Sequence, residues 1–136
     1  MTTTASHRQL PRRAVAVTAA ALAALVVWSV AVPLLGVHLT VRTTPGSSMQ
    51  TIGAGPVVAV SLLVSLLGWG LLSALERRTQ RAGTLWTAAA GVVLLLSLTG
   101  PLTAAVNTGS KVSLVMLHLS VAAVLIPLLR RTALPR

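Results

Sequence analysis

Four long apolar runs alternate with short polar segments along the chain. The runs cover residues 14–35, 57–75, 85–106 and 112–129. Each is close to the ~20 residues that an α-helix needs to cross the hydrocarbon core of a bilayer at 1.5 Å per residue. Charged side chains fall almost entirely between the runs. The pattern predicts an all-α fold, a four-transmembrane-helix antiparallel bundle that spans residues 14–129.

The composition excludes a water-soluble domain. Hydrophobic residues make up 54% and charged residues 9% of the 136 positions, and the mean hydropathy is +0.87. This leaves too little polar surface to cover a soluble fold. Eleven Lys and Arg residues against one acid would suit a nucleic-acid binder, but they cluster between apolar runs and lack aromatic residues that stack on bases. The predicted partner is therefore the lipid bilayer and not nucleic acid.

The positions of the basic residues predict the orientation of the chain. Arginines concentrate in the N-terminal tail 1–13, the loop between the second and third runs, and the C-terminal tail 130–136. They are Arg8, Arg12, Arg13, Arg77, Arg78, Arg81, Arg130, Arg131 and Arg136. The other two loops hold only Arg42 and Lys111. Because loops rich in Lys and Arg stay cytoplasmic, these arginines act as topology anchors and both termini are predicted to be cytoplasmic. A second role open to them is binding to anionic lipid head groups.

Prolines and glycines predict where the helices end. Pro11 is expected to stop any early helix, so that residues 1–13 form a flexible tail. The pair Gly100-Pro101 is expected to kink the third helix or to end it early. The longest connection, residues 36–55, contains the turn-forming pair Pro45-Gly46 and is the expected place for specific contacts.

The first apolar run has an alternative interpretation as a secretory signal peptide. Arg12 and Arg13 precede it, and Ser29-Val30-Ala31 is a small-x-small triplet of the kind that signal peptidase cleaves. The run is longer than a usual signal core, which favours a retained transmembrane helix. The remaining three spans would keep their places under either interpretation.

Small residues recur at helical spacing and predict close packing between the helices. In lipid, helices associate through close approach at small residues and through hydrogen bonds between polar side chains. The predicted contact positions are Ala19 with Ala23, Ala20 with Ala24, Thr87 with Gly91, and the series Ser61, Ser65 and Gly68.

His118 is the only ionisable side chain well inside an apolar run, and such a residue suggests a functional site. Six residues past Val112, it should lie ~9 Å below the surface of the hydrocarbon core. Hydroxyl side chains on the other helices reach the same depth. They are Ser29, Ser61, Ser65, Ser97 and Thr99. The sequence therefore predicts a polar layer around His118 in the outer half of the bundle.

Three roles for this layer remain open. Neutral His118 can hydrogen-bond one of the hydroxyls and so stabilise the bundle by roughly 1 kcal/mol. The layer can instead bind a ligand, an ion or a proton. Haem ligation has poor geometry, because the second histidine, His38, falls in the outer loop and not on a facing helix.

Other candidate chemistry is sparse. Glu76 is the only acid, and since it precedes Arg77 and Arg78 at the membrane surface it is expected to pair with an arginine or to face water. Small multidrug exporters of four helices depend on a carboxylate inside the membrane, and this chain has none. The sequence offers no Ser-His-Asp set, no paired carboxylates, no metal-ligand cluster and no phosphate-binding glycine loop. We therefore expect no enzymatic activity, no metal and no cofactor.

Three segments carry a resemblance to a known family. They are GVHLTVR at 36–42, GWGLLSALER at 68–77 and HLSVAAVLIPLL at 118–129. Together with the four spans, the chain resembles an uncharacterised family of small actinobacterial membrane proteins, grouped as a domain of unknown function. The resemblance covers essentially the whole chain. It implies four helices in a bacterial plasma membrane and supplies no catalytic residues.

Two functions of different classes follow from these expectations. The first is a structural or accessory membrane protein that acts by helix packing with itself or with a larger membrane partner. The second is an oligomeric small-molecule or ion transporter, or a ligand-binding membrane protein, that uses the polar layer around His118. Oligomerisation would be needed for the second, because four helices seldom enclose a pathway alone.

Overall fold

The computed structural model describes residues 3–42, 44 and 46–133. Its elements are α1 (Thr3–Ser29), the π-helical segment η1 (Val30–Leu34), β1 (Thr40–Val41), β2 (Gln50–Thr51), α2 (Ala54–Arg78), α3 (Ala82–Ser97), α4 (Thr99–Ala104) and α5 (Thr108–Arg131). Four helical stretches are long and apolar enough to cross a membrane: Gln9–Leu34, Ala54–Arg78, Ala82–Ala104 and Thr108–Arg131. The predicted all-α fold of four helices is confirmed, and the protein is a multi-pass membrane protein.

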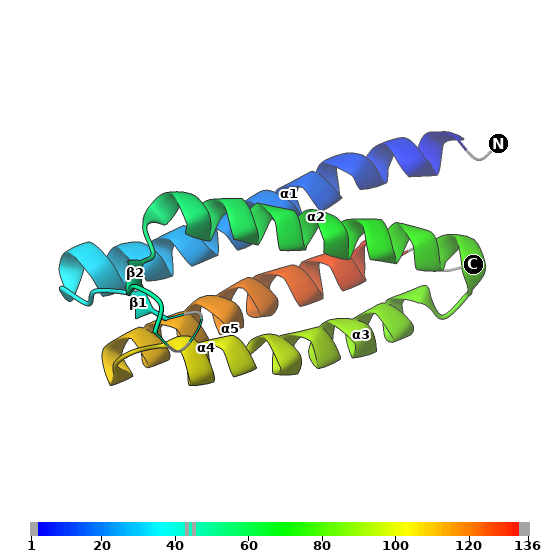
Figure 1. Cartoon of the computed structure of the whole chain (residues 1–136). Coiled ribbons are helices and arrows are strands. Elements are labelled where there is room, and N and C mark those ends of the chain that lie inside the picture. Colours follow the sequence, from blue (N-terminus) through cyan, green and yellow to red (C-terminus); the bar gives the residue numbers. More distant parts are fainter. Residues whose placement is uncertain (1–2, 43, 45, 134–136) are drawn as a thin grey trace.

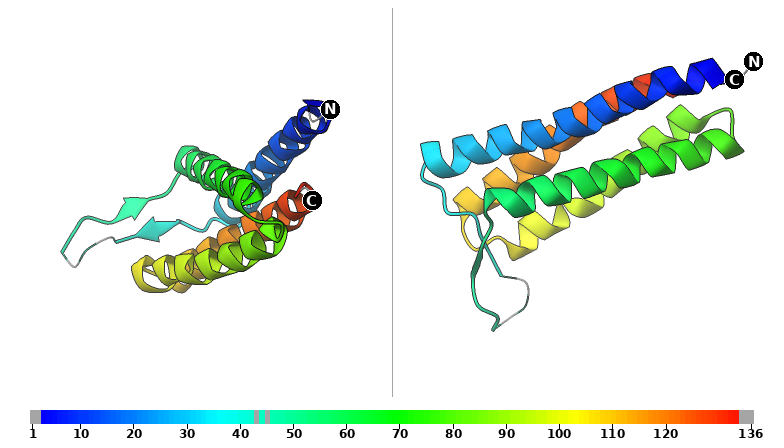
Figure 2. Two further views of the ribbon diagram at one scale, coloured as in Figure 1. Left: turned by 90° about the vertical axis from the view of Figure 1, so that its right-hand side faces the viewer. Right: turned by 90° about the horizontal axis from the view of Figure 1, so that it is seen from above.

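The helices form an antiparallel bundle in which neighbours in space are mostly neighbours in sequence (Figure 1). α1 packs most extensively against α5 and then against α2, and α3 packs against both α5 and α2. α2 and α5 contact each other little, so they lie across one diagonal of the bundle. Figure 2 shows the β-hairpin formed by β1 and β2 projecting from one end.

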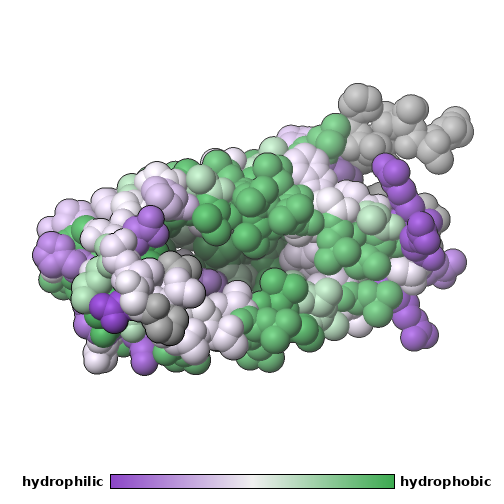
Figure 3. Space-filling model, in the orientation of Figure 1, coloured by the Kyte–Doolittle hydropathy of each residue, from purple (hydrophilic) through white to green (hydrophobic). Residues whose placement is uncertain are grey.

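The two ends of the bundle differ in chemistry. The start of α1 and the end of α5 lie beside the α2–α3 connection, as Figure 1 shows. We call this the arginine-rich end. The hairpin and the α4–α5 link lie at the opposite end, the hairpin end. In the space-filling view, hydrophilic residues gather at both ends and hydrophobic residues cover the helices between them (Figure 3).

The prediction that Pro11 ends an early helix, leaving a flexible tail, is wrong. α1 begins at Thr3 and continues through Pro11. A proline removes its own N–H donor and crowds the carbonyl four residues earlier. The turn that follows Pro11 is held by Arg13, whose buried side chain bonds to α2 and to Thr132 at the end of α5. Helix thus extends well beyond the apolar run, and α2 and α5 likewise continue to Arg78 and Arg131.

At the hairpin end, α1 passes into η1, which contains Pro33. The Leu35 N–H donates to the Val30 carbonyl at 3.0 Å, five residues back, and the Val37 N–H donates to the Ala31 carbonyl at 2.9 Å. Gly36 makes this ending possible because it adopts a φ of +66°, in the left-handed region that favours glycine. The chain therefore turns sharply at Gly36 toward the hairpin.

The expected break near Gly100-Pro101 is confirmed. α3 ends at Ser97, and α4 starts two residues later. Pro101 cannot donate a backbone hydrogen bond, which interrupts the ladder one turn earlier. The hydroxyls of Ser97 and Thr99 donate to the carbonyls three residues back, at 2.8 Å and 2.7 Å. These bonds satisfy carbonyl groups around the break.

Small residues let α1 approach its neighbours closely. Ala16, Ala20 and Ala24 recur at four-residue spacing and are all 0% exposed. Ala16 and Ala20 pack in a cluster with Trp86 and Leu129, and Ala24 packs in a second cluster with Leu114 and Leu117. The predicted pair Ala20 and Ala24 thus lies in the core. The predicted pair Thr87 and Gly91 does not pack in this way, because a Cβ on Gly91 would meet nothing within 4 Å.

The Trp86 side chain fastens α3 to α2. Its Nε1 donates to the Gly68 carbonyl at 2.7 Å, and its ring is 2% exposed. Gly68 lies directly beside this ring, since a Cβ built there would be in van der Waals contact with Trp86 and Leu125, at 3.7 Å from each. The Ser61, Ser65 and Gly68 series marks this interior side of α2, where Ser61 and Ser65 are also buried.

We predict that Ala24→Leu destabilises the bundle. The Ala24 side chain is 0% exposed, so a larger side chain must displace helix α5 or α2, at a cost of about 1–3 kcal/mol. The thermal unfolding midpoint in detergent should fall. Val26→Leu is the matched control, because Val26 is 62% exposed and its replacement should leave the midpoint unchanged. Equal midpoints for the two variants would contradict close packing at Ala24.

Candidate functional site

The most connected polar site lies at the arginine-rich end and is centred on Arg13. The Arg13 residue is 5% exposed although it carries a charge. Its guanidinium lies between α1, α2 and the end of α5. Buried charges of this kind persist only when they are paired and hydrogen-bonded, so each contact of Arg13 matters.

Arg13 uses all three of its side-chain nitrogen atoms. Nη2 donates to Glu76 Oε1 at 2.6 Å, forming the ion pair, and to the Thr132 carbonyl at 3.2 Å. Nη1 donates to Ser73 Oγ at 3.0 Å, and Nε donates to Thr132 Oγ1 at 3.2 Å. The Ser73 hydroxyl in turn donates to the Trp69 carbonyl. One side chain of α1 therefore binds two helices.

The position of Arg13 also matches the electrostatics of the helix ends. Thr132 is the residue that caps α5, and Glu76 lies in the last turn of α2. Carbonyl groups at a helix C-terminus carry partial negative charge and attract a cation. Arg13 therefore neutralises the only acid and one of the free carbonyls at the end of α5.

Sequence reasoning found half of this site. Glu76 was expected to pair with an arginine or to face water, and it does pair with one, but the partner is Arg13 of the supposed tail and not the adjacent Arg77 or Arg78. The available signal was helical phase. Arg13 precedes the buried residues Ala16 and Ala20 by three and seven positions, which places it on the same helix face.

The other predicted topology anchors stay at the surface. The described side chains of this set are exposed: Arg12, Arg77, Arg78, Arg81, Arg130 and Arg131. Arg136 lies outside the described residues. Arg13 is therefore distinguished from its neighbours by burial as well as by its partners.

His118 lies inside α5, half-buried, and hydrogen-bonds to its own helix. Its Nδ1 lies 2.7 Å from the Leu114 carbonyl oxygen, one turn back. Because a carbonyl can only accept, Nδ1 carries the proton in this contact. Among the described residues no hydrogen bond joins His118 to a hydroxyl of another helix. His38, the proposed second haem ligand, is exposed at the hairpin end.

The hydroxyls of the predicted polar layer separate into two groups. Ser29 and Thr99 are exposed on the outside of the bundle. Ser61 and Ser65 are 7% and 0% exposed, and Ser65 Oγ has no hydrogen-bond partner within the described part of the chain. Ser97 is half-buried and donates to the Leu94 carbonyl of its own helix. The structure therefore gathers two of the five predicted hydroxyls in the interior, on α2.

A second polar contact set closes the hairpin end and was missed by sequence reasoning. Ser110 Oγ donates to the His38 carbonyl at 2.7 Å and accepts from the Thr40 N–H at 3.0 Å. Asn107 caps α5 by accepting from the Ser110 N–H at 2.7 Å. The asparagine followed by serine three residues later, at the start of an apolar run, is the capping signal that could have located it.

The hairpin is also tied to its surroundings through backbone groups. The Arg42 N–H donates to the Ala104 carbonyl at 2.9 Å, and the Val106 N–H donates to the Thr40 carbonyl at 3.1 Å. Trp28 Nε1 donates to the Ile52 carbonyl at 3.2 Å. The long outer connection is thus fastened to α1, α4 and α5.

The arrangement of ionisable groups holds structure together and offers little chemistry. Within the described ranges, no group of three or more His, Cys, Asp or Glu residues could hold a metal ion. The carboxylate of Glu76 is occupied by the guanidinium of Arg13. What the site can do is join three helices by charge-assisted hydrogen bonds.

Comparison with known proteins agrees with the sequence resemblance. Residues 4–135 match the model of a family of unknown function, DUF6069, and the chain belongs to this family. No curated protein and no solved structure matches the chain.

We predict that breaking the Arg13–Glu76 pair destabilises the protein strongly. Their side chains are 6% and 11% exposed, and removing one partner of a buried pair costs about 3–5 kcal/mol because the other charge is left unpaired. Glu76→Gln and Arg13→Gln should each lower the unfolding midpoint in detergent. The double variant should be less destabilised than the sum of the two single variants. Arg12→Gln, at the exposed neighbouring position, is the control and should change little.

We also predict that His118→Leu is well tolerated. The variant loses a hydrogen bond within one helix, so the loss should not exceed about 1 kcal/mol. Leu117→Ala provides the comparison, because Leu117 is 6% exposed and its truncation should cost about 2–5 kcal/mol. Thermal unfolding of both variants in the same detergent checks this. A drop for His118→Leu as large as that for Leu117→Ala would show that His118 holds helices together.

Proposed function

We propose that this member of the DUF6069 family is a structural or accessory protein of the bacterial plasma membrane. It acts by packing its helices against another copy of itself or against a larger membrane protein, and it is not an enzyme. An actinobacterial source and cytoplasmic termini belong to the same proposal. Nine arginines in three segments support this orientation, and the start of α1, the α2–α3 connection and the end of α5 lie together at one end of the bundle (Figure 1).

The observation that carries this proposal is the contrast between the interior and the outer faces of α2 and α3. The interior is closely packed, with alanines of α1 against large side chains such as Trp86 and Leu72, and it is fastened at one end by the Arg13 contacts. The outer faces present large apolar side chains that are mostly exposed. Examples are Leu63, Leu67, Val92, Val93, Leu95 and Leu96, which are between 56% and 70% exposed.

Such faces suit association within the membrane. Lipid alone would also cover them, but α2 and α3 are the least buried of the four spans and lie side by side. Gly91 is open on α3, with nothing within 4 Å of an added Cβ, and Thr87 lies one turn before it. Small residues of this kind allow a second helix to approach closely.

The transporter alternative has weaker support. It requires a polar layer shared by several helices, whereas His118 bonds to its own helix and Ser29 and Thr99 are exposed. Ser61 and Ser65 are the remaining buried hydroxyls of that layer. They alone would have to supply the contacts of a substrate in the interior.

Single-cysteine crosslinking in native membranes tests the proposal, because the sequence contains no cysteine of its own. Leu95→Cys places a thiol on the outer face of α3, where Leu95 is 70% exposed. We expect it to form a discrete disulfide-linked dimer on oxidation, or a discrete product with a membrane protein when a bifunctional thiol reagent is added. Ala20→Cys is the matched control, because Ala20 is 0% exposed and should give no product.

Native mass spectrometry of the wild-type protein released from membrane vesicles supplies the second reading. The proposal expects a homo-oligomer or a complex with another membrane protein. A bare monomer, together with no crosslinked product from Leu95→Cys or from Leu67→Cys on α2, would contradict it. A homo-oligomer that retains a small solute, lost in His118→Leu, would favour the transporter alternative.

A further inference from the structure

We propose that the outer surface of α2 at the arginine-rich end is a binding site for an anionic phospholipid. Arg77 and Arg78 would bind the phosphate, and one acyl chain would lie along α2 over Gly70 and Ala74. The groove shares Ser73 with the interior contacts of Arg13, and its apolar extension over Leu67 and Leu63 belongs to the outer face of α2 that the packing proposal also uses.

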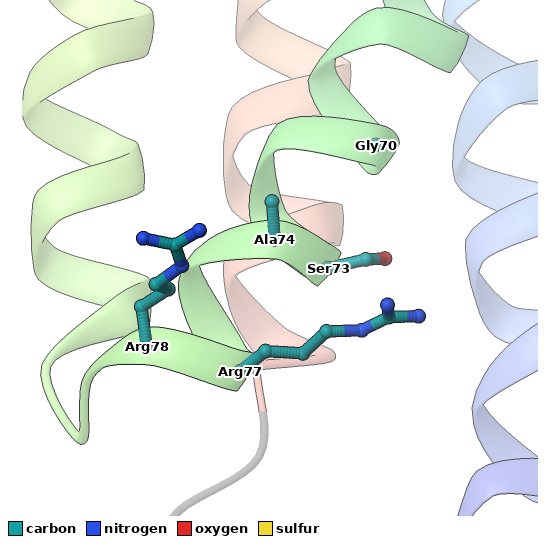
Figure 4. Close-up of a pocket in the computed structure, with 5 residues that line it drawn as sticks. All are labelled: Gly70, Ser73, Ala74, Arg77 and Arg78. Atoms are coloured by element: carbon teal, nitrogen blue, oxygen red, sulfur yellow. The ribbon is translucent and has the colours of Figure 1, made fainter.

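The site is a shallow groove of about 430 Å³. It is lined by Gly70, Ser73, Ala74, Arg77 and Arg78. Figure 4 shows the two arginine side chains diverging, with Ser73 and Ala74 between them and Gly70 one turn farther along the helix. The groove thus has an apolar floor at Gly70 and Ala74, and it is cationic where α2 ends, at Arg77 and Arg78.

Small side chains create the floor. Gly70, Ala74 and Arg78 follow one another at four-residue spacing, so they lie on one face of α2. A Cβ built on Gly70 would meet nothing within 4 Å, and Gly70 and Ala74 are both exposed. The surface is therefore recessed where neighbouring positions of α2 carry leucine.

Charge supplies the attraction for an anion. The arginine-rich segments carry nine arginines and one acid, Glu76, and that acid is bound by Arg13 at 2.6 Å. Arg77 and Arg78 are exposed. Guanidinium groups bind phosphate oxygens through paired, charge-assisted hydrogen bonds. A phosphodiester at this level would meet both charge and donors.

The apolar surface beyond the groove favours a lipid over a free phosphate. Leu67 and Leu63 continue the exposed face of α2 toward the middle of the span, and they are 64% and 58% exposed. A free phosphate would use only the two arginines. A phospholipid would also use the recess at Gly70 and the leucines beyond it.

Ser73 links the groove to the interior without competing for the ligand. Its hydroxyl accepts from Arg13 Nη1 and donates to the Trp69 carbonyl. The hydroxyl hydrogen is therefore already used, and Arg77 and Arg78 are left as the donors of the groove. These two arginines are accordingly the residues whose removal should decide binding.

The first test measures phosphatidylglycerol bound to the full-length protein by native mass spectrometry, after reconstitution in vesicles of phosphatidylcholine with a titrated fraction of phosphatidylglycerol. The double variant Arg77→Gln/Arg78→Gln should weaken binding by about 30-fold, because each arginine near an anionic lipid contributes roughly a fivefold increase. The matched control is Arg130→Gln/Arg131→Gln, which removes the same charge from the end of α5. It should weaken binding by less than about threefold.

The second test separates lipid from free phosphate. Gly70→Leu fills the recess and leaves both arginines in place, and the open space at Gly70 makes it compatible with the fold. It should weaken phosphatidylglycerol binding, while inorganic phosphate at millimolar concentration should not displace the lipid from the wild-type protein. The thermal unfolding midpoint in detergent, measured for every variant, should stay at the wild-type value.

Three outcomes would overturn the proposal. Wild-type binding in Arg77→Gln/Arg78→Gln would exclude these arginines, and equal loss in the Arg130→Gln/Arg131→Gln control would show a general surface attraction only. Displacement by inorganic phosphate, with no effect of Gly70→Leu, would show a free-anion site instead of a lipid site. The same spectra report protein partners separately, so failure here is distinguishable from failure of the packing function.

Discussion

The ion pair between Arg13 and Glu76 is the interaction on which the arginine-rich end depends. A charged Arg13 residue that is only 5% exposed is stable only with the hydrogen bonds of its guanidinium satisfied. Glu76, Ser73 and Thr132 supply those bonds from α2 and from the end of α5. The only acid in the chain is thus used inside the protein, and the remaining arginines keep their positive charge at the surface.

Between the two polar ends, close packing of side chains holds the helices together. The alanines of α1 let α5 and α2 approach closely, and the Trp86 indole fills the space beside Gly68 on α2. At the hairpin end, Ser110 joins the start of α5 to the outer connection. The polar contacts that fix the ends therefore lie where water or lipid head groups are near, and the middle relies on close packing.

The sequence predicted the helices well because apolar length and arginine placement follow directly from the bilayer. The break before Pro101 was also predictable, since proline lacks a donor. The role of Arg13 was not, because Pro11 suggested an early stop and a charge next to an apolar run normally marks a surface. The hydrogen-bond partner of His118 was not predictable for a related reason. Its depth was deduced from spacing, but its partner depended on rotation, and the ring bonds to the Leu114 carbonyl of its own helix.

The reach of Arg13 also bears on how the protein is made. Its contacts with Ser73 and Thr132 span 60 and 119 positions of sequence. During synthesis the first helix enters the membrane before the fourth. The contacts of Arg13 with α2 and with the end of α5 can therefore form only after those helices have been inserted. Only then can its charge be buried. Completion of this contact thus requires that α1, α2 and α5 have assembled.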